Sequence, residues 1–401
     1  MKFEVRRHLA SIVIAVVSIV MIIAIGFLIV VATRALPAVE GTVATIENTD
    51  KKPTELAWPG QGQAAIGTLD GGLKTAIGDD TPRPIASIAK VITALVILDA
   101  KPIEGDGPLI TMTADDVALL RQTIASNGSH LYITEGEQLS QRQMVEAMML
   151  PSANNIADGL AVWAFGGMDN YRSTAEAWLI KHGLNHTTIG ADASGLDPGT
   201  TSTTADLFEI GRLALQNPTL RNIVREPMAN FPIEGDLLNN NQLLRDGSGY
   251  IGIKTGNSDQ ALSCLLFASE HTVGGSRVTI IGVLLEQNFG TTFDKARALN
   301  QSAADNLVEY KIPAGTTVGQ YQTPWGATVQ AITTSSISGV IWRDENPSPD
   351  VVLDYVTPPA HNDPLVGGAS LGNQATDVKL GGVLSAPNLW WKIKNLPTLQ
   401  W

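Results

Sequence analysis

The sequence at residues 84–95 reads PIASIAKVITAL, and this stretch decides the fold of the chain around it. The apolar residues recur at three- and four-residue steps, at Ile88, Val91, Ile92, Leu95 and Leu98. Because this spacing gathers them on one face, it predicts a buried helix over residues 85–99.

Two polar residues, Ser87 and Lys90, lie at the start of this helix. Residues three apart share a helix face, so Lys90 can reach the Ser87 hydroxyl. A serine becomes a good nucleophile only when a base takes its proton. A lysine can be that base if burial or a second cation lowers its pKa, and Lys254 is the candidate cation. The alternative is that Ser87 is a plain helix cap and Lys90 a solvated lysine.

Two further motifs follow along the chain. Ser152-Ala153-Asn154 lies at a helix boundary, where the Ser152 hydroxyl can relay a proton to a leaving amine and the Asn154 amide can orient a substrate. The alternative function of both residues is helix capping.

The third motif, Lys254-Thr255-Gly256, ends a predicted strand and is followed by Asn257. A lysine ammonium and a threonine hydroxyl there would receive a carboxylate, and Gly256 lets a substrate backbone come close. The alternative is an ordinary strand end with a turn.

Elsewhere, periodicity and turn residues predict an α+β arrangement, in which an early hairpin joins the late strands in one sheet. The hairpin is predicted over residues 63–68 and 73–77, the later strands over 250–254, 262–269 and 278–286, and further helices over 139–150, 153–163, 169–182, 204–215 and 292–308. A capping box, Ser140 with Gln143, begins the first of these helices.

The motifs Ser-x-x-Lys, Ser-x-Asn and Lys-Thr-Gly, in this order, are typical of penicillin-binding proteins and class A β-lactamases. With them, residues 63–310 resemble the D-alanyl-D-alanine carboxypeptidases, the low-molecular-mass penicillin-binding proteins of serine peptidase family S11. Other segments that resemble this family are Gly128-Ser129, Gly136-Glu137 and residues 192–197, 204–206 and 241–244. The resemblance implies a β-lactamase/transpeptidase-like domain with an antiparallel sheet and a helical cluster.

The resemblance also implies an activity: release of the terminal D-alanine from a peptidoglycan stem peptide, through an acyl-enzyme that water hydrolyses. β-Lactams would acylate the same serine, and no metal or organic cofactor is expected. The implied catalytic residues are Ser87, Lys90 and Ser152, and the implied substrate-binding residues are Asn154, Lys254, Thr255, Gly256 and Asn257. The backbone N–H groups of Ser87 and Asn257 would form the oxyanion hole.

Some features depart from the family pattern or leave alternatives open. Ala153 and Asn155 stand where the family usually has Gly and Asp, which bears on substrate preference. A D,D-endopeptidase, which cuts cross-links, would use the same machinery. A serine β-lactamase is disfavoured because residues 234–239, EGDLLN, do not match its Glu-x-x-Leu-Asn loop. A non-catalytic wall-binding scaffold would have no use for three intact motifs.

Residues 9–32 form an unbroken apolar or small-residue run, long enough to span a ~30 Å hydrocarbon core as a helix. Lys2, Arg6 and Arg7 precede it, so the positive-inside rule predicts a single-pass anchor on a bacterial membrane, with the later residues outside the cytoplasm. A cleaved signal peptide is the alternative, but its apolar core is normally shorter.

The remaining segments are predicted from composition. Residues 35–62 are expected to form a stalk, and residues 311–386 a small all-β sandwich domain with a long loop over 346–376. Residues 387–401 are expected to form a Trp-rich tail that either lies at a membrane surface or caps the β domain. The net charge of −12 argues against nucleic-acid binding. The single cysteine, Cys264, excludes an internal disulfide and is expected to be buried and inert.

Overall fold

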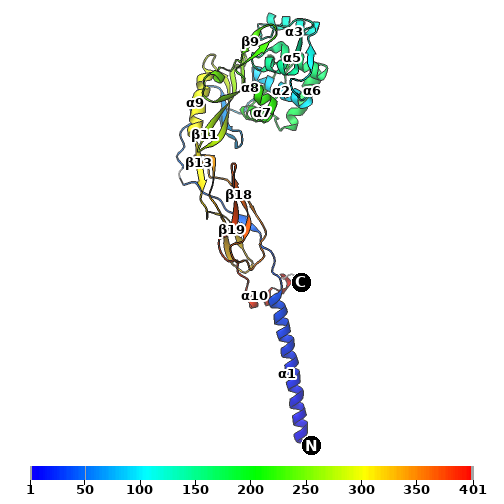
Figure 1. Cartoon of the computed structure of the whole chain (residues 1–401), viewed down its shortest axis with the longest axis vertical. Coiled ribbons are helices and arrows are strands. Elements are labelled where there is room, and N and C mark those ends of the chain that lie inside the picture. Colours follow the sequence, from blue (N-terminus) through cyan, green and yellow to red (C-terminus); the bar gives the residue numbers. More distant parts are fainter. Residues whose placement is uncertain (1, 50, 399–401) are drawn as a thin grey trace. The chain divides into compact units, whose positions relative to one another are not determined.

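The computed structural model describes residues 2–49 and 51–398 (Figure 1). The chain divides into two compact units, one of residues 53–308 and one that combines residues 1–52 with 309–401. Each unit has its own sheet, and the three sequence motifs all belong to the first unit.

The first unit is built on a five-stranded antiparallel sheet. Its strands, in spatial order, are β10 (Tyr250–Ser258), β11 (Leu262–Val273), β12 (Ser276–Gln287), β2 (Gln63–Thr68) and β3 (Gly72–Ile77). The prediction that the early hairpin joins the late strands is therefore confirmed. Strand β10 lies at the edge of this sheet, so one side of its backbone is open to a ligand.

Helices cover both faces of this sheet (Figure 1). Helix α7 (Thr204–Gln216) packs closely on one face, where Gly211 lies against Leu266 and Ile281. Helix α9 (Thr292–Asp305) covers the other, where the Ser269 hydroxyl donates a hydrogen bond to Asn300. Successive side chains of β11 point alternately toward the two helix layers that cover the sheet. Because both faces are covered, the centre of β11 is a continuous apolar run.

A cluster of helices and short strand pairs completes the first unit. The helices are η1 (Ala86–Ile88), α2 (Ala89–Ala100), α3 (Ala114–Ala125), α4 (Gln141–Met149), α5 (Asn154–Phe165), α6 (Met168–Lys181), α8 (Pro218–Val224) and η2 (Gln242–Arg245). The strand pairs are β4 (Arg83–Pro84) with β7 (Thr201–Ser202), β5 (Leu109–Thr111) with β6 (Gln138–Ser140), and β8 (Met228–Phe231) with β9 (Gly235–Leu238). Helix α2 is buried on nearly all sides, and the capping box at Ser140 is confirmed. Helices α3 and α8 were not predicted from the sequence.

The second unit contains a six-stranded sheet. Its spatial order is β1 (Gly41–Val43), β14 (Thr317–Gln322), β15 (Thr328–Thr333), β19 (Gln374–Leu380), β18 (Leu365–Leu371) and β17 (Asp350–Leu353), beside the pair β13 (Leu307–Ile312) and β16 (Ile337–Trp342). The long loop expected over residues 346–376 is wrong, because β17 and β18 lie within it. Most Pro, Asn, Asp and Gly residues of this stretch lie between the strands. The average composition of the whole stretch therefore hides the short apolar runs that form the strands.

The second unit also differs from expectation near its N-terminal end. Strand β1, which lies within residues 35–62, pairs antiparallel with β14. The sequence analysis expected a stalk in this segment and did not predict β1. Three residues are too few for an alternation pattern to be visible, and the pairing partner lies far along the chain.

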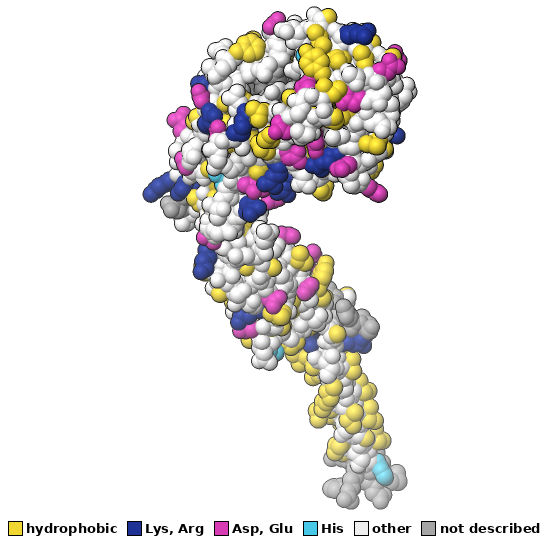
Figure 2. Space-filling model, turned by 45° about the horizontal axis from the view of Figure 1, so that its top comes forward, with side chains coloured by type: hydrophobic (Ala, Val, Ile, Leu, Met, Phe, Trp, Pro, Cys, Tyr) yellow, Lys and Arg dark blue, Asp and Glu magenta, His cyan; other side chains and the backbone are white. Residues whose placement is uncertain are grey.

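Helix α1 (Lys2–Thr33) contains the predicted apolar run. Its segment His8–Thr33 is long and apolar enough to cross a membrane, and Figure 2 shows hydrophobic side chains covering it. The C-terminal helix α10 (Leu389–Lys394), followed by η3 (Leu396–Thr398), packs beside its end. The buried Lys392 Nζ donates hydrogen bonds to the carbonyl oxygens of Ala32 (2.7 Å) and Arg34 (3.4 Å), so the tail binds the exit of α1.

Candidate active site

Ser87 lies in η1, at the point where the chain enters helix α2. The strand pair β4 with β7 and a hydrogen bond from the Ile85 N–H to the Thr200 carbonyl hold this entry in place. The preceding residue, Ala86, has a φ of 46°, a conformation that costs an L-residue about 1 kcal/mol or more. Such strain persists only where the surrounding structure enforces it, so the position of Ser87 is closely determined.

Lys90 lies one turn after Ser87 and is fully buried. Its Nζ lies 2.7 Å from Ser87 Oγ, 2.7 Å from Asn154 Oδ1 and 2.9 Å from the Ser194 carbonyl oxygen. The prediction of a solvated Lys90 is therefore excluded, and the first and second motifs meet at this nitrogen.

Burial lowers the pKa of Lys90 to about 7, although Asp158 and Asp192 act in the opposite direction. The three contacts are compatible with a neutral amine. An amide oxygen and a carbonyl oxygen can only accept, so they take the two N–H bonds of the amine, whereas the Ser87 hydroxyl can donate its proton to the remaining lone pair. This is the arrangement that a general base requires.

The second motif lies beside Lys90 through Asn154. Ser152 has a φ of 68° and is buried, and its Oγ has no hydrogen-bond partner among the described residues. An unpaired buried hydroxyl costs stability, and this one lies two residues before Asn154, which contacts Lys90.

Neighbouring hydrogen bonds attach the second motif to the loop at residues 128–131. The Asn154 N–H donates to the Ser129 carbonyl (2.7 Å). Asn155 Oδ1 accepts from the Leu131 N–H and its Nδ2 donates to the Leu131 carbonyl, both at 3.0 Å. An aspartate could accept but not donate there. Asn155, at the position where the family usually has Asp, thus both accepts from and donates to Leu131. We call this pair of hydrogen bonds the two-way link to the loop.

The third motif lies on the edge strand β10, which packs directly against η1. A Cβ at Gly256 would lie 2.7 Å from the Ile85 carbonyl oxygen, so glycine is needed for this close approach. Lys254 is buried, and its Nζ donates to the Thr255 carbonyl oxygen at 3.1 Å. Thr255 is buried and Asn257 exposed.

The two buried lysines interact electrostatically. Burial and then the charge of Lys90 hold the pKa of Lys254 well below its usual value. The sequence analysis assigned Lys254 the role of lowering the pKa of Lys90. In the structure, burial is the cause that lowers the pKa of Lys90, and the repulsion between the two lysines acts on Lys254.

Two acidic residues near Lys90 were not predicted to belong to the site. Asp192 Oδ1 accepts hydrogen bonds from the N–H groups of Ser194 (2.8 Å) and Gly195 (2.6 Å), and so it shapes the loop that presents the Ser194 carbonyl to Lys90. Asp158 accepts from the Ala193 N–H at 2.9 Å, and burial raises its pKa to about 6. The one signal for Asp158 is its place four residues after Asn154, on the same face of α5.

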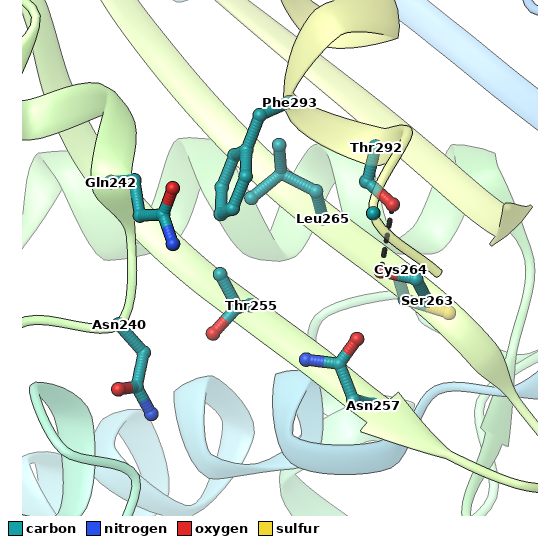
Figure 3. Close-up of a pocket in the computed structure, with 10 residues that line it drawn as sticks. Asn240, Gln242, Thr255, Asn257, Ser263, Cys264, Leu265, Thr292 and Phe293 are labelled. Atoms are coloured by element: carbon teal, nitrogen blue, oxygen red, sulfur yellow. Dashed lines mark hydrogen bonds between the residues drawn. The ribbon is translucent and has the colours of Figure 1, made fainter. Parts of the chain in front are cut away.

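A cavity of about 380 Å³ lies beside the third motif (Figure 3). Thr255 and Asn257 line it from β10, Asn240 and Gln242 from the segment before and within η2, and Thr292 from the start of α9. The motif residues therefore border a space that can hold part of a ligand.

Known proteins resemble this chain in sequence and in fold. Residues 71–288 match the family Peptidase S11, D-alanyl-D-alanine carboxypeptidase. The chain is 30% identical over 242 residues to the D-alanyl-D-alanine carboxypeptidase DacB2 of Mycobacterium tuberculosis, which covers 58% of this chain and 79% of that protein. It is 30% identical over 193 residues to a D-alanyl-D-alanine endopeptidase of Escherichia coli, covering 47% and 59%. The structure of the Streptomyces K15 DD-transpeptidase superposes with a TM-score of 0.55 at 26% identity, covering 63% of this chain and 98% of the other.

Proposed function

The chain belongs to the Peptidase S11 family of D-alanyl-D-alanine carboxypeptidases, and on that premise we propose that Ser87, Lys90 and Ser152 carry out its reaction. The protein is a serine-type D-alanyl-D-alanine carboxypeptidase with the transpeptidase-like fold of penicillin-binding proteins. The observation that supports the assignment best is the position of Lys90 Nζ, 2.7 Å from Ser87 Oγ and held by two oxygens that only accept.

In the proposed acylation step, Ser87 Oγ attacks the carbonyl carbon of the penultimate D-alanine while its proton passes to the neutral Lys90 Nζ. The backbone N–H groups of Ser87 and Asn257 stabilise the oxyanion that forms. The carbon–nitrogen bond then breaks, and the leaving amine of the terminal D-alanine receives a proton by way of the Ser152 hydroxyl. Water hydrolyses the ester, with Lys90 again taking the proton, and releases the shortened stem peptide.

Substrate binding is proposed to depend on the third motif and Asn154. The terminal carboxylate would accept a hydrogen bond from the Thr255 hydroxyl and lie near Lys254, and Gly256 lets the substrate backbone lie along the edge strand. A carboxylate beside Lys254 raises the pKa of that lysine, because it stabilises the ammonium. The protonated Lys254 in turn disfavours a proton on Lys90, so substrate binding would favour the neutral base. The amide Nδ2 of Asn154, whose Oδ1 is held by Lys90, would orient the peptide.

The experiment that tests this assignment is labelling by fluorescent penicillin together with D-alanine release from a pentapeptide that ends in D-Ala-D-Ala. The wild-type protein is expected to show both, and Ser87→Ala neither. A folded Ser87→Ala protein that is labelled like the wild type would disprove the nucleophile. Rapid turnover of benzylpenicillin without D-alanine release would instead indicate a β-lactamase, and neither activity in a folded wild-type protein would indicate a scaffold.

The membrane topology and the orientation are also proposals. The helix over His8–Thr33 supports a single-pass anchor, and Lys2, Arg6 and Arg7 before it support an N-terminus in the cytoplasm. External protease added to spheroplasts is expected to remove the catalytic unit and to leave an N-terminal tag protected. A catalytic unit that resists protease until the membrane is lysed would contradict the orientation.

The domain division is proposed as follows: 1–34 cytoplasmic stub and anchor, 35–62 stalk, 63–310 peptidase domain, 311–386 small β-rich sandwich domain, and 387–401 tail. A separate apolar core that includes Val318, Tyr321 and Val378 supports a β-rich domain of its own. A protein reduced to residues 53–308 is expected to fold and to be labelled by penicillin. Its failure to fold while the full chain is labelled would contradict the independence of the peptidase domain.

A further inference from the structure

Helix α2 carries a second polar side chain, that of Thr93, on the side where Lys90 lies. Thr93 follows Lys90 by one turn, so the two side chains share a helix face, and Thr93 is fully buried. Its Oγ1 lies 2.7 Å from the Ala193 carbonyl oxygen, and Lys90 Nζ lies 2.9 Å from the carbonyl oxygen of the next residue, Ser194. Two side chains of α2 therefore bind two successive carbonyl groups of one loop.

Tyr171 of helix α6 is the third member of this buried network. Helix α6 lies beside α2 (Figure 1), and the buried Tyr171 OH lies 2.7 Å from Thr93 Oγ1. Thr93 has one hydroxyl proton and a carbonyl oxygen can only accept, so Thr93 donates to Ala193 and Tyr171 donates to Thr93. The Ala89 carbonyl oxygen, 3.3 Å from Thr93 Oγ1, is the more distant acceptor for the same proton. Burial raises the pKa of Tyr171 far above its usual value, so the phenol keeps its donor proton.

The peptide group between Ala193 and Ser194 is held at both of its ends. Its carbonyl oxygen accepts from Thr93, and its N–H donates to Asp192 Oδ1 at 2.8 Å. The preceding N–H, that of Ala193, donates to Asp158 Oδ1 at 2.9 Å. Because a peptide group is planar, fixing its oxygen and its hydrogen fixes its orientation. The next carbonyl group, which accepts from Lys90, is thereby aimed as well.

The same loop packs directly against the residue that precedes the nucleophile. Gly195 has a φ of 77°, and a Cβ at this position would overlap the Ala86 carbonyl oxygen. Glycine is therefore needed for this close approach. The loop at residues 193–195 thus contacts both the entry to Ser87 and the amine of Lys90, and a shift of the loop would affect both.

The direction of the Ser194 carbonyl matters for the chemistry of Lys90. A neutral amine has two N–H bonds and one lone pair, and the N–H bonds point to Asn154 Oδ1 and the Ser194 carbonyl oxygen. The lone pair is then left facing the hydroxyl of Ser87. If the Ser194 carbonyl moves, the amine can rotate about its Cε–Nζ bond, and the lone pair turns away from the hydroxyl.

We propose that Thr93 and Tyr171 are positioning residues of the general base, which hold the Ser194 carbonyl so that the lone pair of Lys90 faces Ser87. This inference rests on the proposed function, since it requires Lys90 to take the proton of Ser87. Thr93 and Tyr171 act on the reaction through Ala193 and Ser194. A purely structural role would instead lower stability and leave the rate of acylation unchanged.

The experiment measures the reaction of full-length protein with benzylpenicillin by quenched flow, which separates the Kd of the non-covalent complex from the rate constant of acylation. Thr93→Val removes the hydroxyl and keeps a similar shape, and Tyr171→Phe removes only the phenol oxygen. The rate constant is expected to fall about tenfold or more in Thr93→Val and about threefold or more in Tyr171→Phe. The Kd is expected to stay within about twofold of the wild type in both. Thr93→Ser restores the hydroxyl and is expected to recover most of the rate.

The matched controls are Thr333→Val and Tyr321→Phe in the other unit. Each removes a buried hydroxyl that donates to a backbone carbonyl oxygen, at 2.9 Å to Pro313 from Thr333 and at 2.7 Å to Asp354 from Tyr321. Both controls are expected to be acylated like the wild type, with folding checked by circular dichroism.

Three outcomes would overturn the inference and leave the proposed function standing. They are wild-type acylation in folded Thr93→Val and Tyr171→Phe, a Thr93→Ser protein as slow as Thr93→Val, and equal slowing in the two controls. If Thr93→Val does not fold, Tyr171→Phe decides, because it keeps the aromatic ring. A folded wild-type protein that is not acylated would mean that the proposed function itself has failed.

Discussion

The Nζ of Lys90 lies 2.7 Å from the Oγ of Ser87, and both residues face the same side of one helical turn. The two residues are three positions apart in the sequence. The ability of Lys90 to act as a base, however, depends on segments that are distant in the chain. Asn154 and Ser194 supply the two acceptors that orient the amine, and burial removes the water that would keep it protonated.

The rate of acylation is predicted to rise with pH through about 7. Burial lowers the pKa of Lys90 to about 7, so the neutral, base-competent form increases above this pH and disappears below it. The measurement is the rate constant for acylation by benzylpenicillin from about pH 5 to pH 9, with folding followed by circular dichroism. A rate that is flat over this range, or that rises toward acid, would contradict the role of Lys90.

Asp158→Asn is predicted to move the midpoint of this pH profile to lower pH. Asp158 raises the pKa of Lys90, so removal of its charge lets the amine lose its proton more easily. The asparagine oxygen can still accept the hydrogen bond from the Ala193 N–H, which preserves the local structure. Asp169→Asn, at a fully exposed side chain, removes the same charge from the surface and should leave the midpoint unchanged. An upward shift in Asp158→Asn would refute this electrostatic assignment.

Ser152→Ala is predicted to reduce D-alanine release by about 10²–10⁴-fold with little loss of stability. Its Oγ has no partner among the described residues, so no hydrogen bond is lost. The matched control is Ser202→Ala, which removes a fully buried hydroxyl that contacts Thr187 at 2.8 Å. The control should be less stable by about 1 kcal/mol and keep its activity. Thermal unfolding and product release, measured on both variants, separate the two effects. A Ser152→Ala protein with full activity would remove Ser152 from the mechanism.

Asn155→Asp is predicted to destabilise the protein by about 1–3 kcal/mol, although it restores the residue usual in the family. The aspartate keeps the acceptor for the Leu131 N–H but loses the donor, and its charge faces the Leu131 carbonyl oxygen. Urea unfolding is the measurement. Asn373→Asp, in the exposed turn after β18, adds the same charge and should unfold like the wild type. Equal midpoints for the two variants would show that the two-way link contributes nothing.

Most elements of the first unit could be predicted because their sequences are locally periodic. Helix α7 begins at Thr204, as predicted, and Ser140 caps α4. Helix α3 was missed, although its apolar residues and the capping box of Thr113 with Asp116 are both visible in the sequence. Strands β1 and β17 were missed because a strand of three or four residues shows no alternation and is recognised by its pairing partner.

The sequence by itself determined the order of the three motifs, the helix that aligns Ser87 with Lys90, and the strand that carries Lys254. These features depend on the spacing of residues within a few helical turns or within one strand. Only the tertiary structure decided the pKa values of Lys90 and Lys254. The pKa of Lys90 depends on complete burial and on Asp158 and Asp192. The pKa of Lys254 depends on burial and then on the charge of Lys90, which lies far earlier in the chain. The same is true of the cavity beside the third motif, because the segments that line it are far apart in the chain and meet only in the folded protein.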